Sequence, residues 1–110
     1  MLTPKKLQEE QRPWVKHNFG GRRAWYPLLG LMEELGEIAH AFLKREQGIR
    51  GTEAEHLEAI KDGVGDVVIF LADFCSANDL DFQECVEVTW AKVKQRDWKA
   101  NPLNGEKDIQ

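Results

Sequence analysis

Apolar side chains recur every three or four positions along most of the chain, which is the period of an amphipathic α-helix. In residues 27–47 they form one stripe: Leu28, Leu31, Met32, Leu35, Ile38, Ala39 and Phe42. In residues 53–77 they form another: Ile60, Val64, Val67, Leu71 and Phe74. We expect both stripes to face a core. No segment has a convincing strand pattern, so the sequence predicts an all-α fold.

Capping residues mark the starts of the predicted helices. Thr3 precedes the first, Asp81 precedes the last, and Thr52 with Glu55 has the spacing of a capping box. Gly48 is suited to end the second helix. The predicted helices span residues 4–17, 27–47, 53–77 and 82–98. They favour a four-helix-bundle-like single domain over residues 1–110, with a core at about 3–98 and a tail at 99–110.

The length and charge of the chain narrow the classes of partner. A domain of 110 residues has a small core and a large surface, so we expect self-association into a dimer or tetramer. The net charge of −4 argues against binding to a nucleic-acid polymer. The longest apolar run, residues 67–72, is too short to span a membrane, and residues 1–10 lack a signal-peptide core. A cytoplasmic location is therefore expected, where Cys75 and Cys85 act as small apolar residues.

Acidic residues gather on the other side of the two long helices. Glu33, Glu34 and Glu37 lie opposite the apolar stripe of residues 27–47, where a solvated surface is the ordinary interpretation. The helix over residues 53–77 carries Asp62, Asp66 and Asp73, yet it is apolar nearly all round and should be buried on more than one face. Buried carboxylates must be protonated, paired or bound to metal.

Five of these carboxylates, contributed by two adjacent helices, would make an oxygen-rich cage. Hard divalent cations prefer such ligands, and Mg²⁺ combines a few carboxylates with water and phosphate oxygens. The spacing of Glu33, Glu34, Glu37, Asp62 and Asp66 therefore suggests a magnesium site.

The motif around these glutamates resembles that of a known family. Residues 31–39, Leu-Met-Glu-Glu-Leu-Gly-Glu-Ile-Ala, look like the E-E-x-x-E motif of MazG-type all-α nucleoside triphosphate pyrophosphatases, and the resemblance extends over about residues 14–101. The family's second motif, E-x-x-D, corresponds to residues 61–68. There Gly63 replaces the expected glutamate, and we expect Asp62 to substitute for it.

The resemblance implies a reaction and its residues. The enzyme would use Mg²⁺, with Mn²⁺ as a possible substitute, to hydrolyse an NTP or dNTP to the monophosphate and pyrophosphate in nucleotide-pool housecleaning. Glu34, Glu37, Asp62 and Asp66 would be the metal ligands, and Glu33 would bind a further ion or orient the attacking water. The implied catalytic residues are Glu33, Glu34, Glu37 and Asp66.

The resemblance also implies where the substrate binds. Lys92 and Arg96 would contact the polyphosphate, although a solvated helix end explains them equally well. Aromatic residues cluster before the first motif and can stack on a base. The predicted base-binding residues are His17, Phe19, Trp25 and Tyr26, whereas Trp14 is expected in the core.

Three other functions fit parts of the sequence. Glu37-x-x-His40 and Glu53-x-x-His56 match the E-x-x-H element of di-iron helical proteins. The Gly63 departure fits a non-catalytic helical oligomer that binds nucleotide or a protein partner. Phosphoribosyl-ATP pyrophosphatase is a further option within the same superfamily, ranked below the housecleaning role.

Overall fold

The computed structural model describes residues 1–106, and most of them are helical. The helices are α1 (Pro4–Phe19), α2 (Tyr26–Gln47), α3 (Glu53–Ala77) and α4 (Phe82–Val93). The described part of the chain contains no strand, so the all-α prediction is confirmed. Residues 107–110 of the predicted tail lie outside the described residues. Within residues 1–106, no helix is long and apolar enough to cross a membrane.

The predicted caps form the helix starts. The side chain of Thr3 accepts a hydrogen bond from the amide of Lys6, and that of Asp81 accepts one from Glu84. Thr52 and Glu55 make both bonds of the capping box, each 3.1 Å long. These bonds satisfy amide groups that have no partner within the helix, so local sequence alone fixes three of the four starts.

The predicted end of the last helix is wrong, because α4 stops at Val93 rather than near Trp98. The carboxylate of Asp97 accepts hydrogen bonds from the amides of Lys99 and Ala100, at 3.1 and 3.0 Å. The amide of Asp97 itself donates to the carbonyl of Gly105, at 2.8 Å. A short acidic side chain that bonds to nearby amides competes with helix formation, and here it closes a compact loop instead.

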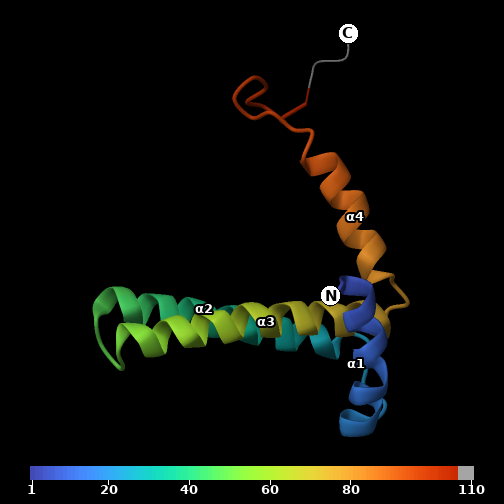
Figure 1. The fold of residues 1–110 in the computed structure, drawn as a ribbon, viewed down its shortest axis with the longest axis horizontal. Helices are drawn as coiled ribbons and strands as arrows, with labels where there is room; N and C mark the ends of the chain where they lie inside the picture. Colours follow the sequence, from blue (N-terminus) through green and yellow to red (C-terminus); the bar gives the residue numbers. More distant parts are fainter. Residues whose placement is uncertain (107–110) are drawn as a thin grey trace.

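The long helices α2 and α3 lie side by side along most of their lengths, and α1 crosses one end of the pair (Figure 1). Helix α3 contacts all three other helices, as its nearly continuous apolar surface predicted. Helix α4 leaves this end and projects away, so that it contacts α1 and α3 but not α2 (Figure 1). The four helices are therefore bundle-like around α3, and one of them forms an arm.

Two glycines let α2 and α3 approach closely. A Cβ atom added to Gly30 would lie 2.3 Å from Cε1 of Phe70, and one added to Gly63 would lie 2.4 Å from Cγ1 of Ile38. Both distances are below van der Waals contact, so a side chain at either position would force Phe70 or Ile38 to shift. The two contacts also set the antiparallel register. They bring the middle of α2, at Glu34, level with Asp66 on α3.

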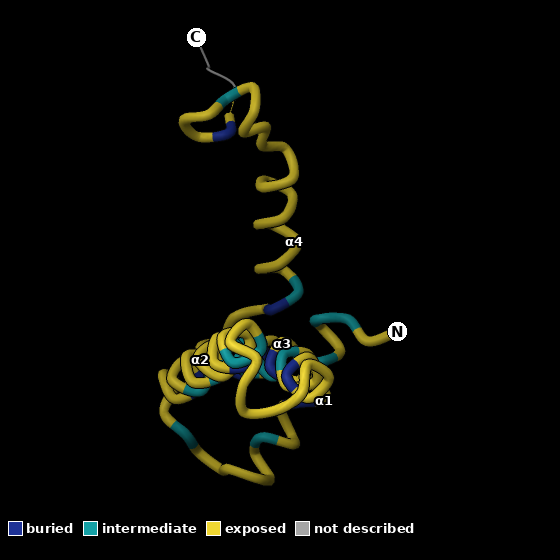
Figure 2. The backbone as a smooth tube through the Cα atoms, turned by 90° about the vertical axis from the view of Figure 1, so that its left-hand side faces the viewer, coloured by how far each residue is buried: buried dark blue, intermediate teal, exposed yellow. Residues whose placement is uncertain are grey.

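The expectation that both apolar stripes face a core is only partly met. Leu31 and Ile38 of α2 are half-buried, as are four of the five stripe residues of α3. However, Leu28, Met32, Leu35 and Phe42 are between 43% and 60% exposed, and Val64 of α3 is 55% exposed. The physical reason is that, among the described helices, only α3 contacts α2, so the part of the apolar stripe turned away from α3 is uncovered. Figure 2 shows α2 coloured largely as exposed.

The buried apolar cluster lies instead where α1, α3 and α4 meet. It consists of Ala72, Cys75 and Phe82, with Leu7 and Leu71 packed against it. Trp14, expected in the core, is 54% exposed and makes an edge-to-face contact with Phe19. The radius of gyration is 17.9 Å, whereas a compact chain of this length has one of about 13 Å. The single chain is thus open, with much of its apolar surface uncovered.

The glycine contact between the long helices predicts the effect of adding one methyl group. Gly63→Ala should reduce the free energy of unfolding by about 1–3 kcal/mol, because the new Cβ meets Ile38 in a tightly packed interface. Thermal or urea unfolding would measure the change. Gly65→Ala is the matched control on the same helix, since a Cβ there meets nothing within 4 Å. It should be neutral or gain up to about 1 kcal/mol from helix propensity. An equal loss of unfolding free energy in both variants would show that the contact with Ile38 is not the cause.

Candidate metal centre

Three glutamates of α2 form an acidic group on one face of the helix. Glu33, Glu34 and Glu37 each offer a carboxylate oxygen, and these oxygens lie within 4.8 Å of one another. Positions three and four apart are neighbours on a helix surface, which is why Glu37 meets the other two. Glu33 and Glu37 are exposed, whereas Glu34 is half-buried beside α3.

Glu34 is the most constrained member of the group. Its Oε2 atom is buried and has no hydrogen-bond partner among the described residues. Burial raises the pKa of this carboxyl group above its ordinary value of 4.5, and the neighbouring charges of Glu37 and Asp66 raise it further. A carboxylate that is desolvated, surrounded by negative charge and lacking a partner is stabilised by a cation.

Helix α3 contributes a facing carboxylate. Asp66 is half-buried and close enough to Glu34 to act on its pKa. Asp62 lies one helical turn earlier, is exposed, and is outside the group of three glutamates. The position between them, Gly63, is directed at Ile38 rather than at the glutamates. The structure therefore brings Glu33, Glu34 and Glu37 together and places Asp66 near Glu34, whereas both aspartates lie outside the group of three glutamates.

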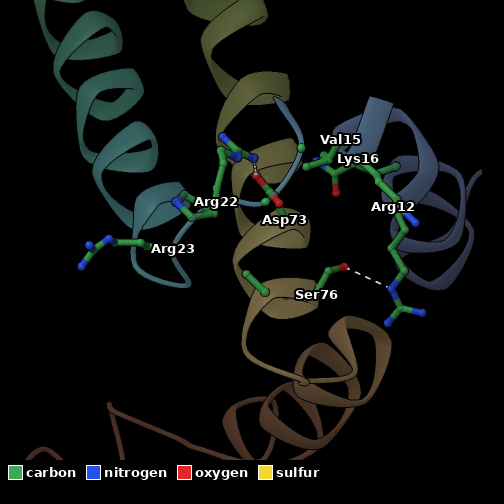
Figure 3. A pocket seen from close by; sticks show the side chains of 12 residues that line it. Arg12, Val15, Lys16, Arg22, Arg23, Asp73 and Ser76 are labelled. Atoms are coloured by element: carbon green, nitrogen blue, oxygen red, sulfur yellow. Dashed lines mark hydrogen bonds and ion pairs between the residues drawn. The ribbon is translucent and has the colours of Figure 1, made fainter. Parts of the chain in front are cut away.

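The third aspartate of α3 has a different role. Asp73 is buried and forms an ion pair with Arg22, which comes from the loop between α1 and α2 (Figure 3). The guanidinium group of Arg22 also lies 4.7 Å from the ring centroid of Phe19 and 5.8 Å from that of Tyr26. Arg22 lies between the helices predicted over residues 4–17 and 27–47, where helical periodicity assigns it no contact. The one signal for this pair was an aspartate on a helix that is apolar nearly all round.

Most of the predicted base-binding residues share one surface pocket. Phe19, Trp25 and Tyr26 line it together with Arg22 and Arg23, and its volume is about 540 Å³. The rings of Trp25 and Tyr26 are 5.6 Å apart at a tilt of 33°. His17 is exposed and is not part of the lining. The pocket offers aromatic faces and two cations on one concave surface.

The side chain of Asn78 also helps to hold the loop that carries these aromatic residues. Its Nδ2 atom donates to the carbonyl of Ala24, at 3.0 Å, and thereby ties the loop to the end of α3. Tyr26 begins α2 and Glu33 follows two turns later, which is about 10 Å along the axis. The aromatic pocket and the acidic group are therefore about two helical turns apart along α2.

The predicted phosphate-binding residues lie elsewhere in the single chain. Lys92 is in the last turn of α4, and Arg96 lies beyond the helix because α4 ends at Val93. Both line a pocket of about 570 Å³ formed with the loop around Asn101 and Gly105. This pocket is on the projecting arm, and α4 makes no contact with α2. Within one chain, these two cations are therefore separated from the acidic group.

The histidines needed by the di-iron alternative lie apart from the glutamate group. The Nε2 atom of the buried His56 lies 2.9 Å from the carbonyl oxygen of Ile49, within hydrogen-bond distance. His40 is exposed on α2. Since the acidic group found among the described residues contains only glutamates, its chemistry is that of oxygen ligands.

No protein-family model, curated protein or solved structure matches the chain. What the site can do therefore follows from its residues. Carboxylate oxygens alone suit hard divalent cations, and Mg²⁺ keeps coordination positions open for water and substrate phosphates. The buried, unpartnered Oε2 of Glu34 fits such an ion, because a cation would supply the partner that the protein lacks.

The raised pKa of Glu34 predicts how the metal-free protein responds to pH. A carboxyl group whose pKa is higher in the folded state binds its proton more tightly there, so stability falls as pH rises above the ordinary value of 4.5. Glu34→Gln should therefore raise the Tm at neutral pH in EDTA and have no effect below that value. Scanning calorimetry across this pH range would measure both. Glu10→Gln on α1 is the control and should show no such dependence on pH. If Glu34→Gln raised the Tm equally at all pH values, the raised pKa of Glu34 would not be its cause.

Proposed function

We propose that this protein is a Mg²⁺-dependent nucleoside triphosphate pyrophosphohydrolase of the MazG type, which converts an NTP or dNTP to the monophosphate and pyrophosphate. The observation that carries the proposal is the unpartnered, buried oxygen of Glu34 within a group of carboxylates. Stability alone does not explain this arrangement, because like charges that are close together and partly desolvated destabilise the fold. A bound cation explains both features.

Each acidic residue has a role in this reaction. Glu34, Glu37 and Asp66 would hold Mg²⁺, and Asp62, which is exposed one turn from Asp66, would supply a further carboxylate. The chemistry that Mg²⁺ would supply there is neutralisation of charge on the triphosphate and a lowered pKa of a water molecule. Glu33 is exposed at the rim of the group, where its carboxylate accepts a hydrogen bond from the attacking water and orients it.

The aromatic pocket supplies a place for the nucleoside. Trp25 and Tyr26 offer faces on which a base can stack, and stacking on aromatic residues contributes about 1–3 kcal/mol per base. Arg22 and Arg23 in the same lining add positive charge near the sugar and phosphates. The two turns of α2 between this pocket and the glutamates match the extended shape of a nucleoside triphosphate.

We also propose that the protein works as a homo-oligomer, with a dimer as the smallest unit. Leu28, Met32, Leu35 and Phe42 follow a spacing that keeps them on one side of α2, and all four are exposed. Large exposed apolar stripes are typical of protein–protein interfaces. A second copy that covers this stripe would complete a four-helix core from two α2–α3 pairs. It could also bring Lys92 and Arg96 of its own arm to the acidic group.

One observation supports a second candidate, a nucleotide-binding oligomer without turnover. The glutamate of the MazG-type second motif would clash at Gly63 unless Ile38 moved, because a Cβ atom there lies 2.4 Å from Cγ1 of Ile38. The metal centre then depends on Asp62 for its last carboxylate, and Asp62 is exposed. The two candidates differ in one measurable property, the release of pyrophosphate.

The catalytic proposal predicts pyrophosphate release in a coupled assay over a panel of NTPs and dNTPs with Mg²⁺. Glu34→Gln and Asp66→Asn should each lower the rate by about 100-fold or more, because a metal ion contributes several kcal/mol of charge stabilisation. Asp62→Asn should cause a comparable loss if this residue is the fourth ligand. Glu10→Gln is the matched control. Release that is no greater in the parent protein than in Glu34→Gln would favour the non-catalytic binder.

Self-association predicts a concentration-dependent mass and a sensitive apolar stripe. Leu35→Glu should weaken the oligomer by about 30-fold or more, since a central apolar contact contributes at least about 2 kcal/mol to an interface. Sedimentation velocity over a dilution series would give the dissociation constant. Leu2→Glu introduces the same charge at an exposed apolar residue before α1 and should leave the constant unchanged. A parent protein that stays monomeric at every concentration would refute the proposal.

A further inference from the structure

A third pocket, here called the basic pocket, lies between α1, the α1–α2 loop and the last turns of α3 (Figure 3). Its volume is about 250 Å³. Four cationic residues contribute to its lining, Arg12, Lys16, Arg22 and Arg23, against one carboxylate, that of Asp73. This concentration of positive charge occurs on a chain whose net charge is −4, so it does not reflect the average composition. The pocket is electrostatically suited to an anion.

The cations of this pocket are largely free to bind. Arg22 is the one member of the four that has a carboxylate partner among the described residues, and that partner is Asp73. Arg12 donates from Nε to the hydroxyl of Ser76, at 3.4 Å, which orients its side chain without neutralising its charge. Arg23 is directed away from Asp73 (Figure 3). Arg12 and Lys16 are exposed on successive turns of α1, on the side that faces the pocket.

A buried side-chain amide in the lining indicates a second property of the ligand, besides its negative charge. Gln11 is only 7% exposed, and its Nε2 atom donates to the carbonyl of Ile69 at 2.7 Å. Its Oε1 atom is buried and has no partner among the described residues. An unpartnered buried acceptor is costly, and only a donor can satisfy it. A ligand that reaches this oxygen from the pocket would carry an N–H or O–H group as well as negative charge.

We propose that this pocket binds a small organic phosphate, such as a phosphate monoester of a sugar or nucleoside. Arg12 and Lys16 hold the phosphate, and a hydroxyl or amino group of the ligand donates to Oε1 of Gln11. Arginine and lysine are the residues that bind phosphate most strongly, through charge-assisted hydrogen bonds. The pocket is distinct from the metal centre, because Asp73 lies about two helical turns beyond Asp66 on α3, or about 10 Å.

Calorimetric titration with ribose 5-phosphate tests the proposal. The titration is made in EDTA and on the Glu34→Gln variant, so that the metal centre cannot hold the phosphate. Binding should be weakened by about tenfold or more in the double variant Arg12→Gln, Lys16→Gln, because both charged donors to the phosphate are removed. Gln11→Glu should weaken it as well, since a carboxylate would repel the phosphate. A thermal scan of each variant checks that it is folded.

Two controls distinguish specific binding in this pocket from nonspecific electrostatic attraction to lysine and arginine side chains. The double variant Lys44→Gln, Lys61→Gln removes the same charge from α2 and α3 near their other connection, and it should leave binding unchanged. Inorganic sulfate, which is an anion without an O–H group at neutral pH, should bind more weakly than the sugar phosphate, because it cannot donate to Gln11. The proposal is overturned if ribose 5-phosphate does not bind, if both double variants weaken binding equally, or if sulfate binds as tightly as the ester. Hydrolysis of triphosphates is not needed for any of these results.

Discussion

The close contact between α2 and α3 is the constraint on which the rest of the structure depends. Gly30 against Phe70 and Gly63 against Ile38 fix both the distance between the two helices and their register. With that register, Glu34 faces Asp66, and a shift by one residue on either helix would turn one of them away. The same contact disfavours a metal-binding side chain at position 63, since such a side chain would displace Ile38. The close packing of the helices at Gly63 therefore conflicts with placing another metal-binding carboxylate there.

The acidic group and the open shape of the chain both reduce the stability of an isolated molecule. Carboxylates that raise the pKa of Glu34 repel one another in the absence of a cation. The buried apolar cluster around Ala72 is small, and the stripe along α2 is uncovered. Anything that binds only the folded state stabilises it by mass action. On the proposed function, metal, nucleotide and a second copy all contribute to folding, and the stability of the protein depends on its concentration.

The parts of the fold that depend on local sequence were predictable. The caps at Thr3, Thr52 and Asp81 place their helices correctly, because each involves residues within one turn. The end of α4 was not, since it depends on a loop closed between Asp97 and Gly105. The exposure of the α2 stripe was not predictable either. Apolar periodicity identifies which residues need covering, but it does not say whether the same chain covers them.

In the candidate site, too, features within one helix could be predicted, whereas contacts between distant segments could not. Glu33, Glu34 and Glu37 follow one another on a single helix, so their proximity could be inferred from spacing alone. The pairing of Arg22 with Asp73 joins a loop to a distant helix, and the orphaned oxygen of Gln11 depends on how α1 docks against α3. Such features arise from tertiary packing, for which this sequence carries no periodic signal.

Arg22 has one further consequence, because it belongs to the lining of both the aromatic pocket and the basic pocket. Its guanidinium group can form an ion pair with Asp73, bind an incoming phosphate or lie against an aromatic ring. A compound that draws it toward one pocket reshapes the wall of the other. Thermodynamic linkage then requires the two affinities to change by the same factor in both directions. Because Arg22 lines both pockets, binding in one pocket can change the affinity of the other.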